Sequence, residues 1–164
     1  MAAAMYYRKP LPGLGPGRED LELAERLLAE LGLGKLAHRS LSAVSSGEAQ
    51  RAMVAHALAK KTPLVALDEP TSFQDPHGKM LVYAMLAREA EKRAVVVATH
   101  DLLFAALNAA SIAMLKNGEV IAAGPPERVL NASNLEELYG AKVAEATVTI
   151  GGRRLALPLP LEAL

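Results

Sequence analysis

A helix-length segment between two short apolar runs most constrains how this chain can fold. Residues 64–67 (LVAL) and 94–98 (AVVVA) are too short for helices and end abruptly in polar residues, as strands buried on both faces do. Asp75-Pro76 begins a helix that we expect to reach about Lys92. Because parallel neighbours need such a crossover, the pattern predicts a right-handed βαβ unit. The fold class is therefore α/β with a parallel sheet.

Polar residues follow both predicted strands at the same edge of the sheet. Asp68 and Glu69 follow the first strand, and residues 99–101 (THD), which include His100, follow the second. Ligands bind at the carboxyl edge of open α/β sheets, where a pair of carboxylates can hold a metal ion and activate water. The structural alternative is an acidic turn that ends at Pro70, with His100 as a surface or capping residue.

A third cluster begins the helix that we expect from residue 45 to about Lys60. Ser45 and Glu48 have the S-x-x-E spacing of a capping box, and a cap alone explains them. A functional interpretation needs the same residues. Ser45, Ser46 and Gly47 place hydroxyls and backbone N–H groups at the positive end of a helix, which suits a phosphate.

The remaining elements follow from turn and cap residues. A helix is predicted from Arg18 with its stop at Gly32, and Asn117-Gly118 predicts a hairpin between residues 111–115 and 119–123. Residues 124–127 (GPPE) begin a short helix, and Ser133 with Glu136 caps another that Gly140 ends. The tail predicts a hairpin of residues 143–150 and 153–157 that turns at Gly151-Gly152 and ends at Pro158 and Pro160, whereas the Pro- and Gly-rich residues 1–17 predict a loop or arm.

Composition limits the classes of partner. The 164 residues suit one domain, and 18 basic residues balance 18 acidic ones, so no overall charge attracts nucleic acid or an anionic membrane. The absence of cysteine excludes disulfides and thiolate-bound metals. With no leader and no apolar run long enough to span a bilayer, we expect a cytoplasmic protein without direct membrane insertion.

Taken together, the separated motifs resemble those of one family, the ATP-binding domains of ABC transporters. Residues 44–48 (VSSGE) resemble the ABC signature, residues 64–69 the Walker B strand, residues 72–75 (SFQD) the D-loop, and residues 99–101 the switch histidine. Residues 124–127, 135–136 and 139–140 are similar to those of importers of iron chelates, cobalamin or metal ions. The resemblance implies a P-loop NTPase fold with an incomplete parallel sheet, a helical signature subdomain (1–61), an α/β part (62–140) and a hairpin tail (141–164).

The resemblance also implies roles for individual residues. Asp68 would help hold Mg²⁺, Glu69 would polarise the water that attacks the γ-phosphate of ATP, and His100 would contact that phosphate. Ser45, Ser46, Gly47 and Glu48 would face the nucleotide of a partner ATPase subunit, and Asp75 would act across the subunit interface. The chemistry would be positioning and charge neutralisation. A homodimer or heterodimer of ATPase subunits, attached to the inner face of the cell membrane through a permease, would be the assembly.

The chain also departs from the family pattern. Neither Gly34-Lys35 nor Gly78-Lys79 lies in a G-x-x-x-x-G-K-[ST] loop, so a Walker A motif is absent and about the first third of such a domain is missing. Ser46 stands where the signature usually has glycine, and Gln74 where the D-loop usually has leucine. The missing P-loop strand would leave a gap in the sheet, which we expect the tail hairpin, a strand exchange in a dimer, or the missing segment itself to close.

Three functions remain open on the sequence. The first is an ATP-hydrolysing subunit, or part of one, of an importer that obtains its P-loop elsewhere. The second is a non-hydrolysing relic or regulatory partner of an intact ABC ATPase, which Ser46 and Gln74 favour. The third is a lobe of a DNA-repair or chromosome ATPase, but residues 1–17 show none of the heptads expected before its signature.

Overall fold

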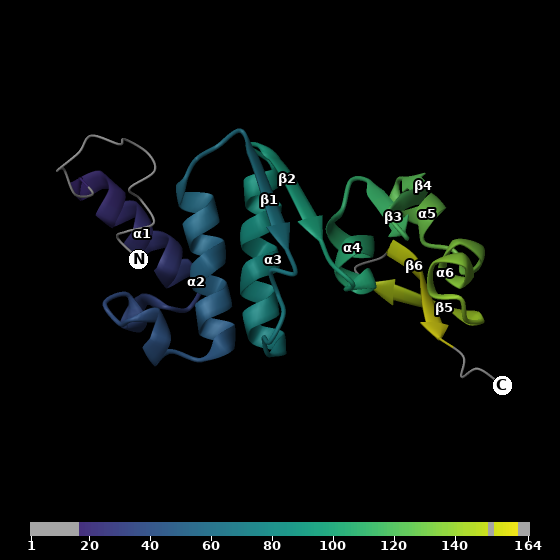
Figure 1. The fold of residues 1–164 in the computed structure, drawn as a ribbon, viewed down its shortest axis with the longest axis horizontal. Helices are drawn as coiled ribbons and strands as arrows, with labels where there is room; N and C mark the ends of the chain where they lie inside the picture. The colour runs from purple at the N-terminus through teal and green to yellow at the C-terminus, as the bar shows by residue number, and fades with distance from the viewer. Residues whose placement is uncertain (1–16, 151–152, 161–164) are drawn as a thin grey trace. The chain divides into compact units, whose positions relative to one another are not determined.

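The protein has alternating helices and short strands, and its computed structural model describes residues 17–150 and 153–160. The chain folds as two compact units, and the boundary between them lies between Thr99 and His100 (Figure 1). The first contains α1 (Arg18–Glu30), α2 (Ser46–Ala59), β1 (Leu64–Asp68), α3 (Pro76–Ala90) and β2 (Ala94–Ala98), with two short 3₁₀ helices at Gly34–Leu36 and Leu41–Ala43. The second contains α4 (Leu102–Asn108), β3 (Ile112–Lys116), β4 (Glu119–Gly124), α5 (Pro126–Val129), α6 (Ala132–Tyr139), β5 (Val143–Ile150) and β6 (Arg153–Pro160).

The predicted βαβ unit is present in the first unit. β1 and β2 pair in parallel from Leu64 opposite Ala94 to Asp68 opposite Ala98, and α3 is the crossover between them. Figure 1 shows α2 and α3 side by side next to this strand pair, and α2 contacts β1 while α3 contacts β2. The core of the unit is formed by apolar side chains of the helices and of β1: Leu28, Leu31, Val54, Leu58, Val65, Val82 and Leu86.

The prediction that both strands are buried on both faces is wrong. Along β1 only Val65 is fully buried, whereas Leu64 is 53% exposed, and Val96 in the middle of β2 is 54% exposed. Since side chains alternate between the faces of a strand, one face of the pair packs on the helices and the other is open. An apolar run marks a strand here, but whether both faces are covered depends on which other elements pack on it.

Helix ends in the first unit lie close to where the sequence places them. Gly17 N donates to Asp20 Oδ2 at 3.2 Å at the start of α1, and Gly32, just beyond its end, has a φ of +74°. Asp75 is the N-cap of α3 and Pro76 its first residue. These local signals need little tertiary support, which is why they could be predicted.

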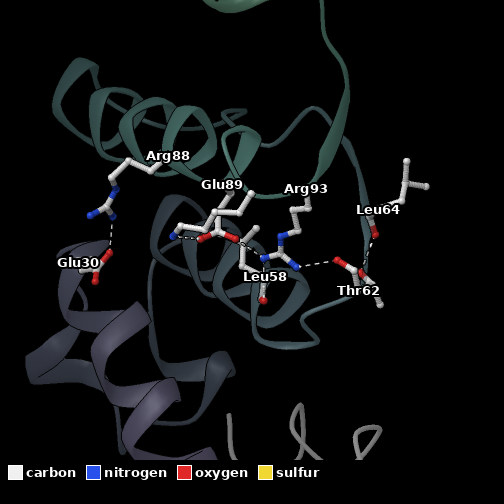
Figure 2. Close-up of polar contacts among 8 residues, drawn as sticks. Glu30, Leu58, Thr62, Leu64, Arg88, Glu89 and Arg93 are labelled. Atoms are coloured by element: carbon white, nitrogen blue, oxygen red, sulfur yellow. Dashed lines mark hydrogen bonds and ion pairs between the residues drawn. The ribbon is translucent and has the colours of Figure 1, made fainter.

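Arg93 joins the far ends of α2 and α3 (Figure 2). Its guanidinium pairs with Glu89 Oε2 at 2.6 Å and donates to the carbonyl oxygens of Leu58 at 3.0 Å and Thr62 at 3.2 Å. Leu58 lies in the last turn of α2, whose carbonyls lack partners within the helix. We call these four residues the Arg93 cluster. It fixes the last turns of both helices and the loop that leads into β1.

The second unit contains the two predicted hairpins. β3 and β4 are antiparallel, with Asn117 and Gly118 at positive φ in the turn and a register shift between Met114 and Leu115. Its core consists of Ala106, Met114, Val129, Leu130 and Leu135. In the described part of the chain the strands form three two-stranded sheets. β1 pairs with β2, β3 with β4, and β5 with β6.

Three details of this unit differ from the prediction. Asn131, not Ser133, caps α6, because Asn131 Oδ1 accepts from Asn134 N at 2.9 Å; Glu136 Oε1 instead accepts from Val143 N at 3.2 Å. β6 continues through Pro158 to Pro160, since an edge strand tolerates residues that lack an N–H.

The end of α6 agrees with the prediction, since Gly140 ends this helix at a φ of +67°. The expected loop at 1–16 and turn at Gly151-Gly152 lie outside the described residues.

Candidate functional site

The capping box at the start of α2 is confirmed. Ser45 N and Ser45 Oγ each donate to Glu48 Oε2 at 2.8 Å, and Glu48 N donates to Ser45 Oγ at 3.3 Å. The hydrogen bonds from the backbone and hydroxyl of Ser45 hold the pKa of the Glu48 carboxyl below its ordinary value. Ser45 and Ser46 are exposed, so this helix end is open to solvent.

The first turn of α2 packs against the segment of residues 72–75. Gly47 is buried, and a Cβ at this position would lie 2.8 Å from the carbonyl oxygen of Phe73. Real Cβ atoms do not approach a backbone oxygen so closely, so only glycine fits without a shift of the backbone. The structure thus brings together Gly47 and Phe73, which lie 26 residues apart in the sequence and belong to two different motifs.

Polar side chains surround the start of α3 in the same region. Asp75 Oδ1 accepts from Gly78 N at 2.7 Å. A Cβ at Gly78 would lie 2.5 Å from Arg51 Nη1, 2.9 Å from Asp75 Oδ1 and 3.0 Å from Gln74 Oε1. Arg51 on α2 therefore reaches the first turn of α3 beside Asp75. Asp75 is exposed, and its carboxylate already caps the start of α3.

The two carboxylates at the end of β1 lie where the sequence predicts. Asp68 is exposed and pairs with Ala98, and Glu69 N donates to the carbonyl oxygen of Ala98 at 2.9 Å. The carbonyl oxygen of Glu69 accepts from Gln50 Nε2 at 3.1 Å and from Ser72 N at 3.2 Å. Glu69 has a φ of +44°, a left-handed conformation that is uncommon for a residue with a Cβ.

His100 is the exposed first residue of the second unit, two positions after β2 ends. The next residue, Asp101, caps α4, since Asp101 Oδ1 accepts from Phe104 N at 3.0 Å. Within residues 17–150 and 153–160, no group of three or more histidine or acidic side chains is arranged to hold a metal ion. The roles of His100 and Asp68 therefore remain predictions.

Sequence patterns assign no individual role to two residues that the structure places in this region. Gln50 follows the capping box and contacts Glu69, and Phe73 is 84% exposed with a φ of +62°. Gln50 carries a weak signal, a polar amide among apolar helix positions. Phe73 carries a better one, since an aromatic residue between two polar ones in a turn is unusual. Neither contact partner could be read from spacing.

Comparisons with known proteins agree with the motifs. Residues 7–72 match the model of the family described as ABC transporter. The cobalamin import ATP-binding protein BtuD of Halobacterium salinarum is 34% identical over 143 residues, which are 86% of this chain and 36% of that protein. This chain is a relative of ABC transporter ATP-binding proteins. The hemin import ATP-binding protein HmuV of Streptomyces coelicolor is 36% identical over 83% of this chain and 49% of its own length.

The fold is that of part of an ABC ATPase domain. A solved structure described as a metal-chelate type ABC transporter in an inward-facing conformation matches 98% of this chain and 65% of its own chain, with a TM-score of 0.82 and 24% identity. The chain spans about one third to one half of the curated ABC relatives it matches. No helix among the described residues is long and apolar enough to cross a membrane.

Proposed function

We propose that this chain supplies the signature, Walker B, D-loop and switch-histidine segments of an ATP-binding subunit of an ABC importer. One observation carries the proposal. The first turn of α2, the 72–75 segment and the end of β1 meet within one compact unit, through Gly47 against Phe73 and Gln50 against Glu69. A capped helix alone would not require this convergence with the exposed Asp68 and the partly buried Glu69.

The residues present suit Mg²⁺ and ATP. Mg²⁺ is usually held in nucleotide sites by one or two carboxylates together with phosphates, and Asp68 offers an exposed carboxylate for this purpose. Bound Mg²⁺ would neutralise charge that develops on the phosphates during transfer. Glu69 would orient water, and His100 would contact the γ-phosphate. Ser46 and Gly47 would present a hydroxyl and backbone N–H groups to the nucleotide of a partner subunit.

Ser45 and Glu48 would shape that partner-facing surface, and the Ser45 hydroxyl would not be free to donate to a nucleotide. Their hydrogen bonds to each other occupy the Ser45 hydroxyl and fix the first turn of α2. Asp75 would hold the adjoining start of α3 and meet the partner subunit across the interface. These roles place five of the proposed site residues, from 45 to 75, on the face that a second ATPase subunit would cover.

The substrate class and assembly are proposed from the relatives. By their names, the two relatives described above act in import of cobalamin and of hemin, and the ferric enterobactin transport ATP-binding protein FepC of Escherichia coli (29% identical) acts in transport of an iron chelate. We infer an importer of iron chelates, cobalamin or metal ions, with ATPase subunits paired beneath a membrane permease on the cytoplasmic side. ATP hydrolysis would need a P-loop that residues 1–164 do not contain.

The first experiment is equilibrium binding of Mg·ATP to the purified chain, alone and mixed with an intact homologous ATP-binding domain. We expect little binding alone and additional affinity or turnover in the mixture, lost in Glu69→Gln or Ser45→Ala. A matched control is Ser42→Ala, which removes an exposed hydroxyl from the preceding 3₁₀ helix. Absence of added binding in the mixture would contradict the proposal.

A non-hydrolysing regulatory partner is the second candidate, and Gln74 favours it. Gln74 Nε2 donates to the carbonyl oxygen of Pro70 at 2.9 Å, while Gln74 Oε1 is buried with no hydrogen-bond partner. A polar side chain folded back into the D-loop-like segment replaces the leucine usual in the family. This candidate predicts that the mixture binds ATP without turnover beyond that of the intact domain.

A further inference from the structure

Glu69 is held in its left-handed conformation by contacts from three parts of the first unit. Its N–H donates to Ala98 in β2, and its carbonyl oxygen accepts from Ser72 N in the following turn and from Gln50 Nε2 in α2. Ser72 Oγ also lies 3.5 Å from Glu69 Oε2. A non-glycine residue persists at positive φ only where its surroundings impose it, and such residues gather at functional sites.

The hydrogen bond from Gln50 differs from the others in its origin. Ala98 and Ser72 belong to the neighbouring strand and to the turn itself, whereas Gln50 extends from the helix that begins with the capping box. Gln50 lies five residues after Ser45, so it is within the first turns of α2. The backbone of the candidate catalytic glutamate is therefore bonded directly to the helix that carries the candidate signature.

We propose that Gln50 is a positioning residue, which holds the backbone of Glu69 and ties the orientation of its carboxylate to the position of α2. The effect on water activation rests on the proposed function, whereas the claim that Gln50 holds the Glu69 backbone does not. When a partner nucleotide shifts the start of α2, the Gln50–Glu69 hydrogen bond transmits the shift to the residue that orients water. Signature engagement and water activation are then linked within one chain.

The contact requires a hydrogen-bond donor at position 50, which the Gln50 amide supplies. The Glu69 carbonyl oxygen has two lone pairs, which Ser72 N and Gln50 Nε2 occupy. Gln50→Met keeps the length of the side chain but removes the donor, so a partly buried carbonyl loses one partner. Gln50→Glu places a second acceptor against the same oxygen and should have the larger effect.

The test is amide hydrogen exchange of the full 164-residue chain, followed by NMR at the Glu69 N–H. Losing one hydrogen bond in Gln50→Met should speed exchange at this amide by about fivefold to tenfold. The matched control is Gln74→Met, which also removes an amide that donates to a carbonyl of the same turn, Pro70 O, but does not contact Glu69. Unchanged exchange in Gln50→Met, or an equal increase in Gln74→Met, would overturn the proposal.

A second background keeps the test decisive if Gln50→Met does not fold. Glycine adopts a φ of +44° without strain, so the Glu69→Gly background should help a Gln50→Met chain to fold. Because glycine keeps the carbonyl oxygen that accepts from Gln50, we expect the residue-69 amide of Gln50→Met/Glu69→Gly to exchange about fivefold to tenfold faster than that of Glu69→Gly alone. Failure of the double variant to fold, or equal exchange in the two variants, would count against a positioning role.

The catalytic part is tested by ATP turnover in the mixture with an intact homologous domain. Gln50→Met should lower the contribution of this chain to kcat about tenfold with the KM for ATP unchanged, because the residue orients a catalytic group without touching nucleotide. An increase in KM with constant kcat would overturn this part. If the wild-type chain adds no turnover, the proposed function fails while the exchange experiment still decides the role of Gln50.

Discussion

The two ends of the α2–α3 pair differ in how their polar groups are used. At the far end, Arg93 satisfies Glu89 and the carbonyls of Leu58 and Thr62 in one cluster (Figure 2). At the near end, Asp68 and Asp75 are exposed, and Glu69 and Phe73 have positive φ. Helices of 14 and 15 residues place the ends about 20 Å apart. One end stabilises the unit, and the other leaves two carboxylates exposed and its backbone strained, a combination typical of functional sites.

The largest expected loss of stability comes from breaking the Arg93 cluster. Arg93→Met should lower the free energy of unfolding by about 3 kcal/mol, because it leaves the Glu89 carboxylate partly buried without its main partner. Thermal or urea unfolding of the full chain measures this loss. The control is Arg88→Met, which breaks an exposed pair with Glu30 and should cost less than about 1 kcal/mol. Equal losses in both variants would remove the contrast between the two ends.

The near end should tolerate no side chain at Gly47. Gly47→Ala forces a Cβ against the carbonyl oxygen of Phe73, and the resulting shift should cost about 2 kcal/mol. Ser46→Ala, one residue earlier and exposed, should change stability by less than about 0.5 kcal/mol. Urea unfolding of both variants compares them. A neutral Gly47→Ala would show that the 72–75 segment is not held against α2.

Acid should weaken the far end through Glu89. Burial alone would raise the pKa of the Glu89 carboxyl, but hydrogen bonds and charge from Arg93 and Lys92 outweigh it and lower the pKa. A lowered folded-state pKa stabilises the fold above the ordinary glutamate pKa of about 4.3, and this contribution is lost as the pH falls through the folded value.

Unfolding measured from pH 7 to pH 3 tests this prediction. Glu89→Gln should be less stable than wild type at pH 7 and should show a shallower loss of stability in acid. Glu48 contributes acid sensitivity of the same sign, because its pKa is also lowered, so Glu48→Gln serves as the comparison at the near end. An identical acid slope in Glu89→Gln and wild type would contradict the assignment.

The smallest expected effect is relief of strain at Glu69. Glu69→Gly should leave stability unchanged or raise it by about 0.5 kcal/mol, because the relieved left-handed strain offsets the greater entropy of glycine in the unfolded chain. Asp68→Gly, in the extended last residue of β1, should instead lower stability by about 0.5–1 kcal/mol. Thermal unfolding compares the two. A greater loss in Glu69→Gly would show that the position is not strained.

Much of the candidate site could be predicted because its parts are local. The Ser45–Glu48 capping box and Asp75 as the cap of α3 follow from short-range patterns, and the parallel pairing that brings Asp68 and Glu69 to the sheet edge follows from the order strand, helix, strand. The contacts that assemble the site could not be predicted this way. Gln50 meets Glu69 across 19 residues of sequence, and Gly47 meets Phe73 across 26. No spacing rule relates such pairs.

The sequence by itself determined the order of elements, the helix caps at Ser45 and Asp75, and the Asn117-Gly118 hairpin, since each depends on the backbone preferences of a few adjacent residues. Only the tertiary structure decided which face of the β1–β2 pair is covered, that Asn131 rather than Ser133 caps α6, and that Glu69 takes a left-handed conformation beside Gln50. Burial and long-range hydrogen bonds depend on what packs against a segment, and that is fixed only when the elements come together.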